Sequence, residues 1–331
     1  MSFTNTFDTT NTGSAVSNRE DLTDVLTILA PEETPILSSA DKKKASSTFV
    51  EWTVDSLAAP STSGISEGAD VTAFTDQFAG RAKLGNRVQK FRRDYMVSDM
   101  QEAVDSVGPA KIAQAEAKAI RELKRDIEAT LASANTQATE NGAGTANALG
   151  GLGDWIQNAA GSANVPAAFQ TPAASVVDAG ATLSESEFNG LITSIFGVTG
   201  STNNLMLIAD TTLRSDISDF ARTTASATDN VRSVNYDGNS GEIKLSVDLY
   251  QSDHGVVSIV NGNPDCMPTQ AGTAGMMGYL VNPEYYGVHE LIPMGSTRLP
   301  NLGGGERGFV DCALTLGVYH PGAHGKIVDP A

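Results

Sequence analysis

The chain has 331 residues and a formal net charge of −17 at neutral pH, and 40% of its residues are hydrophobic. That length fits one elaborate domain or two ordinary ones, and the regular apolar patterns exclude a disordered chain. The acidic balance argues against a dedicated nucleic-acid binder, because such a surface repels phosphate. Residues 135–331 alone carry 19 acidic against 7 basic side chains.

The sequence carries no targeting or membrane signal. The opening residues, MSFTNTFDTT, lack the basic start and apolar stretch of a signal peptide, and no apolar run approaches the ~18 residues of a membrane span. Cys266 and Cys312 are too few for a disulfide scaffold and predict reduced thiols. We therefore expect a protein that is made and works in cytoplasm without membrane contact.

The first 45 residues are expected to form an arm with one short helix. Residues 1–16 are rich in Thr, Asn, Ser and Gly. Ser17 and Glu20 have the spacing of a capping box. A basic cluster follows at Lys42, Lys43 and Lys44. It is interpreted as a solvated turn, with a contact to the acidic face of a neighbouring copy as the alternative.

A hairpin with separated charges is predicted next. From Ser47 apolar residues recur at every second position, which predicts a strand, and a second strand-like run covers Arg87–Val97. Residues 51–80 contain acids and no base, whereas residues 81–93 contain Arg81, Lys83, Arg87, Lys90, Arg92 and Arg93 and no acid. The two arms should pair, yet an isolated hairpin is marginal in water. These six residues and the three lysines are therefore the candidate intersubunit contacts.

The rest of the chain is organised around one long helix, expected from Pro109 to about Ala134. Its apolar residues recur at three- and four-residue steps: Ile112, Ala115, Ala119, Leu123, Ile127 and Leu131. The other face is charged, and Glu122/Arg125 and Lys124/Glu128 stand at pairing distance. About 26 residues make a rod of roughly 39 Å. With one apolar stripe, the helix should lie across a sheet.

After this helix, residues 152–156 are expected to re-enter the core, and a compact α/β section begins near residue 180. Ser184 and Glu187 form a second capping box before an amphipathic helix, and Asp210 should begin another. Period-two or apolar runs predict strands at 205–209, 243–249, 256–260, 276–281, 288–292 and 310–318.

Three patterns raise the possibility of catalysis or metal binding, and none has the required context. Ser66 lies in a G-x-S-x-G pattern, but polar residues flank it where a nucleophile elbow needs a strand and a helix. Residues 303–308 match G-x-G-x-x-G but lead into a strand, which predicts a turn. His320 and His324 have ligand-like spacing without supporting ligands. We therefore expect that the protein is not an enzyme and binds neither a metal nor a cofactor.

The order of elements resembles the major capsid proteins of tailed bacteriophages. Three phrases narrow the resemblance to the SU-ten-like major capsid family: FRRDYMVSDMQ at 91–101, EAKAIRELKRDIE at 116–128 and LGGLGDWI at 149–156. The resemblance implies an α+β, Hong Kong 97-like capsid fold with N-arm, E-loop, long spine helix, P-domain and A-domain. The corresponding boundaries are 1–45 for the N-arm, 46–98 for the E-loop hairpin, 99–165 for the P-domain with the spine helix at 109–134, 166–275 for the A-domain, and 276–331 for the P-domain and closing strands.

The resemblance also implies a function: self-assembly into hexamers and pentamers of an icosahedral shell that encloses double-stranded DNA without binding it specifically. The expected location is the virion capsid, assembled in host cytoplasm. The expected partners are a portal and, as further candidates, separate scaffold or decoration proteins. Some relatives crosslink an E-loop lysine to an asparagine; Lys83 lies in that region, but no pairing is assigned. The alternatives are an encapsulin-like nanocompartment shell and a cytosolic serine hydrolase using Ser66.

Overall fold

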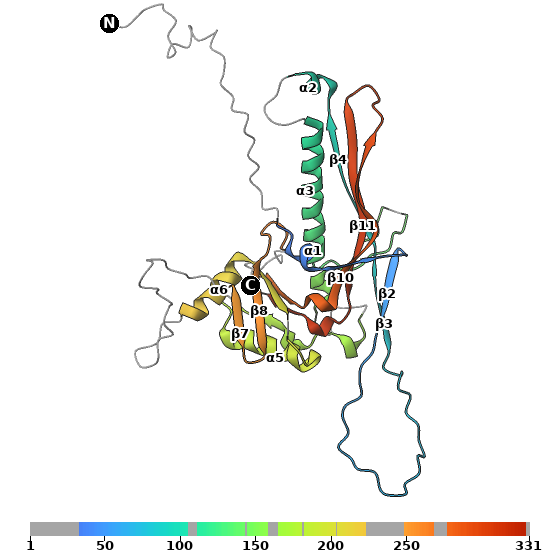
Figure 1. The fold of residues 1–331 in the computed structure, drawn as a ribbon, viewed down its shortest axis with the longest axis vertical. Helices are drawn as coiled ribbons and strands as arrows, with labels where there is room; N and C mark the ends of the chain where they lie inside the picture. Colours follow the sequence, from blue (N-terminus) through green and yellow to red (C-terminus); the bar gives the residue numbers. More distant parts are fainter. Residues whose placement is uncertain are drawn as a thin grey trace, which may run out of the picture.

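The computed structural model describes residues 33–104, 111–142, 144–157, 165–180, 182–202, 204–222, 248–267 and 277–328. The predicted polar arm, the helix after it and Pro109 lie outside these ranges. The described elements form two parts, each with its own apolar core. A long helix stands beside a tall sheet in one part, and a compact α/β section forms the other (Figure 1).

The long helix, α3, spans Lys111–Ala132 and confirms the predicted apolar stripe. Ala119, Leu123, Ile127 and Leu131 are buried, and they pack with the sheet strands into one core. Its 22 residues make a rod of about 33 Å. The predicted pairing of Glu128 with Lys124 is wrong, because Glu128 is buried on the packed side of the helix. On its charged face, Lys118 lies 3.7 Å from Glu122.

The sheet beside α3 has the strand order β1–β10–β11–β4. Its strands are β1 (Asp41–Lys44), β10 (Tyr286–Leu299), β11 (Glu306–Val318) and β4 (Gln89–Val97). β10 and β11 form a long antiparallel hairpin whose turn contains Gly303 and Gly305, both with positive φ. The turn predicted before the last strand is therefore confirmed, and β11 begins at Glu306, inside the G-x-G-x-x-G pattern. The solvated turn predicted at Lys42–Lys44 is wrong: these residues pair with β10 as a parallel edge strand. Their side chains nevertheless stay exposed, because an edge strand tolerates charge on both faces.

Three short helices complete this part: α1 (Pro35–Ser39), α2 (Asp99–Ala103) and α4 (Leu152–Trp155). All residues of α4 are buried, which confirms that residues 152–156 re-enter the core. Trp155 packs against Trp52, with ring centroids 5.5 Å apart. This contact joins α4 to the base of the hairpin described next.

The charge-separated hairpin consists of β2 (Phe49–Val54) and β3 (Ala82–Arg87), paired antiparallel. The strand-like run predicted at Arg87–Val97 is confirmed as β4, which spans Gln89–Val97. The prediction that this run returns beside the first arm is wrong, because the strand paired with β2 is β3. β3 begins at Ala82, and after Val88 the chain enters β4 in the other sheet. Asn86 is buried and polar, so it interrupts the apolar alternation that a sequence pattern relies on.

The α/β part contains a six-stranded sheet of order β5–β12–β9–β6–β8–β7. Its strands are β5 (Val176–Asp178), β12 (Gly325–Val328), β9 (Met277–Val281), β6 (Leu205–Ala209), β8 (Gly255–Asn261) and β7 (Leu249–Ser252). The expected domain division at residue 276 does not separate the sheets, because β9 and β12 complete this one. Residues 243–247 of the predicted neighbour of β8 lie outside the described residues.

Two helices pack on this sheet, α5 (Glu185–Thr199) and α6 (Thr211–Arg222). Both halves of the Ser184–Glu187 capping box are present at α5, as predicted. Short 3-10 helices lie at Ala167–Phe169, Ala173–Ser175, Pro283–Tyr285 and Pro321–Ala323. None of the described helices combines the length and apolarity needed to cross a membrane.

Candidate assembly interface

The base of the β2–β3 hairpin confirms that the acidic and basic arms pair. Arg81 binds Asp55 at 3.0 Å, and Lys83 lies 3.9 Å from Glu51. All four side chains are substantially exposed, so each pair contributes at most about 1 kcal/mol. The charges thus help to set the register of the hairpin, while its attachment to the body depends on buried groups.

Asn86 attaches the hairpin to the body of the subunit. Its amide Nδ2 donates to the carbonyl oxygens of Gly150 at 3.0 Å and Leu316 at 2.8 Å. Its Oδ1 accepts from the Gly150 N–H at 2.8 Å. Asn86 is completely buried, so these bonds are shielded from water. Sequence patterns missed this residue, because nothing distinguishes it from a surface asparagine in a charged stretch.

Beyond the paired strands, residues 55–81 form the hairpin tip, a long excursion from the body that contains neither strand nor helix (Figure 1). Among the residues that the structure describes, its backbone makes only local hydrogen bonds, such as Ala69 N–H to Ser66 O at 3.1 Å. Five large apolar side chains are between 63% and 99% exposed there: Leu57, Ile65, Val71, Phe74 and Phe78. So much exposed apolar surface on one segment makes the hairpin tip a candidate contact surface.

A second exposed apolar group lies at the opposite end of the molecule, where β4, α2 and the β10–β11 turn meet (Figure 1). Its members are exposed to between 43% and 82%: Met96, Met100, Val104, Leu299 and Leu302. Met100 and Leu302 are the chain neighbours of Asp99 and Asn301, which are hydrogen-bonded: Asn301 Nδ2 donates to Asp99 Oδ1 at 3.3 Å. The two apolar surfaces therefore stand at opposite ends of one elongated subunit.

The remaining candidate contacts from the sequence divide into paired and unpaired residues. Lys90 binds Asp311 at 3.0 Å, within the sheet, and the Arg87 guanidinium lies 5.1 Å from the Phe49 ring centroid. Lys43 contacts Asp41 at 3.5 Å, and its ammonium lies 4.1 Å from the centre of the Tyr319 ring. These basic residues already have partners in their own chain.

Arg92, Lys42 and Lys44 differ from those residues. All three are exposed, and none forms an ion pair with any described residue. Arg92 stands on β4 at one edge of the four-stranded sheet, and the two lysines stand on β1 at the other. The structure therefore reduces nine sequence candidates to three basic side chains with no partner among the residues it describes.

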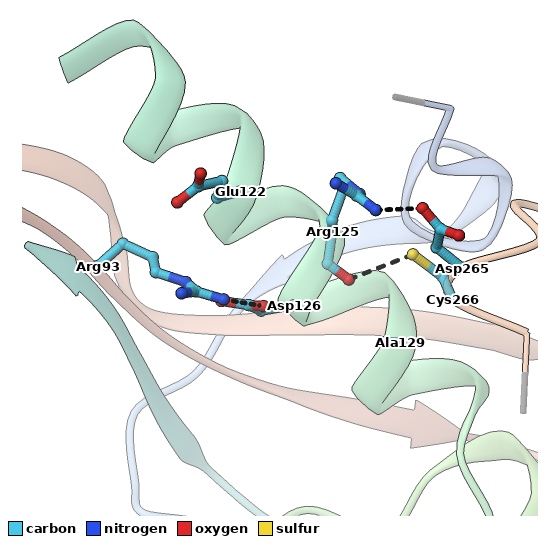
Figure 2. A pocket seen from close by; sticks show the side chains of 7 residues that line it. All are labelled: Arg93, Glu122, Arg125, Asp126, Ala129, Asp265 and Cys266. Carbon is cyan, nitrogen blue, oxygen red and sulfur yellow. Dashed lines mark hydrogen bonds and ion pairs between the residues drawn. The ribbon is translucent and has the colours of Figure 1, made fainter. Parts of the chain in front are cut away.

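Arg93 belongs to a pocket of about 200 Å³ between β4, α3 and the loop after β8 (Figure 2). Its guanidinium makes two bonds to the Asp126 carboxylate, at 2.6 and 2.7 Å. On the other side, Arg125 pairs with Asp265. Each guanidinium is thus balanced by a carboxylate, and the two pairs tie β4 and the loop to α3.

The structure does not place the residues considered for catalysis or metal binding in surroundings that support either role. Ser66 is exposed within the hairpin tip, without the strand before it and helix after it that a nucleophile elbow requires. His324 is completely buried and its Nδ1 accepts from the Asn282 N–H at 3.2 Å, so it is a hydrogen-bonded core residue. Burial lowers the pKa of His324 to about 4. Among the described residues no group of three or more His, Cys, Asp or Glu could hold a metal.

Both cysteines are buried free thiols, as expected. Burial raises the pKa of Cys266 above its ordinary value and that of Cys312 to about 12. A thiol with so high a pKa holds almost no thiolate at neutral pH and is a poor nucleophile.

A long helix beside a four-stranded sheet, a projecting hairpin and a separate α/β part define the Hong Kong 97-type capsid fold (Figure 1). Solved structures agree with this class. The capsid of the cyanophage P-SCSP1u is similar at a TM-score of 0.62 with 13% identity, covering 97% of this chain and 95% of that chain. The capsid of a native GTA particle matches at 0.61 with 12% identity, covering 97% of both chains.

The family profile described as SU10 major capsid protein matches residues 3–331, and the chain belongs to that family. It is therefore a major capsid protein, as the resemblance implied. The holo-SrpI encapsulin complex from Synechococcus elongatus is also similar, at a TM-score of 0.54 with 11% identity, covering 96% of this chain and 95% of that chain. A search of curated proteins found no match.

Proposed function

We propose that this capsid protein assembles through hexamers and pentamers into an icosahedral shell around double-stranded DNA. The observation that carries the proposal is the hairpin tip, which extends away from the body and exposes five large apolar side chains. Burying one such side chain contributes about 1.5–3 kcal/mol. A segment of this kind gains that energy only on another molecule, and in a shell the abundant other molecule is a further copy of the chain.

The net charge of the subunit supports the proposal that the shell encloses DNA. With a net charge of −17, the subunit repels phosphate, which suits a wall that encloses DNA without binding it specifically. Portal, scaffold and decoration proteins are proposed as separate partners, and assembly is proposed to take place in host cytoplasm. The role of the protein is structural, and catalysis forms no part of the proposal.

Electron microscopy of the purified full-length protein tests this function. We expect closed shells or capsomers, and native particles should contain double-stranded DNA. A particle of single-subunit size at every concentration and salt tested would contradict shell assembly. Shells filled with enzymes instead of DNA would favour the nanocompartment alternative, which the similarity to an encapsulin keeps open.

The three unpaired basic residues provide a second test. We expect the triple variant Lys42→Glu, Lys44→Glu and Arg92→Glu to keep its unfolding free energy within about 0.5 kcal/mol, because the side chains are exposed. Its assembly rate, followed by light scattering, should fall and lose its dependence on salt, since exposed charges at the rim of an interface mainly govern encounter.

The matched control replaces the same three residues with Gln, which removes charge without reversing it and should give an intermediate assembly rate. If both triple variants assemble like the wild type, the lysines of β1 serve only to block unwanted pairing along the sheet edge. The proposed intersubunit role of these three residues would then be abandoned.

A further inference from the structure

A carboxylate is buried where α1 meets the long helix. Glu128 of α3 is only 2% exposed, and both of its oxygens face the backbone of α1. Oε1 accepts the Ile36 N–H at 2.8 Å, and Oε2 accepts the Leu37 N–H at 2.9 Å. These N–H groups belong to the first turn of α1, where no intrahelical acceptor exists. Glu128 therefore caps a helix 91 to 92 residues away in the sequence.

No cation lies against this carboxylate among the described residues. Tyr286 of β10 and Cys266 of the loop after β8 face it, and Arg125 is already paired with Asp265. Burial raises the pKa of Glu128 to about 7, although the two N–H donors act in the opposite direction. An ordinary glutamate has a pKa near 4.5, so it is the burial of Glu128 that brings its pKa close to neutral pH.

Three other buried titratable groups near α1, Tyr286, Cys266 and His324, have pKa values outside the range in which Glu128 titrates. Burial raises the pKa of Tyr286 to about 12 and that of Cys266 above its ordinary value of 9.0. His324, whose ring stands 5.8 Å from that of Tyr286, has a pKa lowered to about 4 by burial. Glu33, just before α1, is exposed to solvent. Of the buried groups named here, Glu128 is the one whose protonation changes between about pH 5 and 7. Burial also raises the pKa of Asp154 to about 6, but Asp154 lies on α4 and interacts with Lys326.

Glu128 is also the central attachment of α1. Ile36 is completely buried against the core, and the Asn263 side chain donates to the Glu33 carbonyl at 3.0 Å. The Tyr286 hydroxyl contacts the Ser39 hydroxyl. Three parts of the fold, α3, β10 and the loop after β8, thus hold one five-residue helix. Through α1 the first 32 residues of the chain are covalently joined to the body.

We propose that Glu128 is a proton-operated latch that sets how firmly α1, and with it the N-terminal segment of the chain, is fastened to the long helix. When α1 leaves, Glu128 becomes a solvated side chain on the surface of α3. Docking α1 again returns the carboxyl to its buried position between α3 and α1. The latch goes beyond the proposed shell function and does not depend on it.

The sign of the pH dependence follows from the linkage between proton binding and the docking of α1. The docked state binds the Glu128 proton more tightly than the undocked state, so protonation stabilises docking. This stabilisation is complete below about pH 4.5 and is lost as the pH rises through about 7. The docking equilibrium should therefore weaken by up to about tenfold per pH unit in this window. Mild acid fastens α1, and mildly alkaline solution loosens it.

Hydrogen exchange on the full-length protein, read by mass spectrometry for peptides covering 33–40, tests the latch. Protection, corrected for the intrinsic pH dependence of exchange, should fall on the order of a few hundredfold between about pH 4.5 and 7.5. Peptides from the centre of α3 should not show this fall. Light scattering on the same samples reports the assembly state, and exchange is compared only between pH values at which that state is the same.

Glu128→Gln should abolish the pH dependence, because the amide keeps a carbonyl acceptor but cannot titrate. Glu122→Gln is the matched control, since Glu122 lies on the same helix facing Lys118 and should retain the wild-type dependence. A wild-type protein whose 33–40 protection does not change with pH overturns the proposal, even if Glu128→Gln fails to fold. A Glu128→Gln variant that keeps the wild-type slope overturns it as well.

Discussion

Replacing the five exposed apolar residues of the hairpin tip with serine should abolish closed shells at concentrations where the wild type assembles. The variant carries serine at Leu57, Ile65, Val71, Phe74 and Phe78, which make no contact with the apolar cores of their own chain. Their combined burial on a neighbour supplies on the order of 10 kcal/mol before the costs of association. Removing them takes away most of the favourable energy of that contact.

Electron microscopy and sedimentation measure the loss of shells, and urea unfolding shows that the subunit is intact. Because the five side chains are exposed, the unfolding free energy should stay within about 0.5 kcal/mol of the wild type for each substitution. The matched control changes polar residues of the same segment to alanine: Ser56, Ser61, Ser63, Thr72 and Thr75. The control should assemble. Normal shells from the serine variant would show that the tip does not carry assembly.

The second large effect is expected from Asn86→Asp, a nearly isosteric change in a completely buried side chain. The amide donor to Gly150 O and Leu316 O becomes a second acceptor, so two buried carbonyls lose their donor and face a carboxylate. We expect a loss of about 3–5 kcal/mol in unfolding free energy, as when one partner of a buried polar group is removed.

Chemical denaturation of the unassembled chain measures this loss, and Asn135→Asp is the control. Asn135 is exposed, so its change to aspartate should cost no more than about 0.5 kcal/mol. Because Asn86 joins β3 to β11 and to the residues before α4, the Asn86 variant should also expose the hairpin to proteolysis. Equal stability of the two variants would contradict the anchoring role of Asn86.

Neither group behind these two large effects, the exposed apolar residues of the hairpin tip and the buried Asn86, was predicted from the sequence. The long helix could be predicted because Leu123, Ile127 and Leu131 follow a 3.6-residue period, which records local geometry directly. The alternation of β11 and the capping box at Ser184 are local patterns of the same kind. The acid–base complementarity of the hairpin was also visible, because opposite charges in neighbouring arms favour antiparallel pairing.

Local patterns failed where a residue's partner is far away in the sequence. Glu128 has the spacing of a surface ion pair with Lys124, yet it is buried and caps α1. Arg93 reads as a free basic residue of the hairpin, yet Asp126 binds it. Lys42 and Lys44 read as a turn, because a parallel edge strand depends on a partner almost 250 residues later.

The sequence by itself determined the long helix, the helix after Ser184 and the strands with a regular period, the order of these elements and, through that order and three local phrases, the family. The tertiary structure alone decided which charged side chains are paired inside the subunit and which have no partner among the residues that the structure describes. The reason is physical: helical and strand periods depend on residues a few positions apart, whereas the burial and pairing of a charge depend on what folding brings beside it.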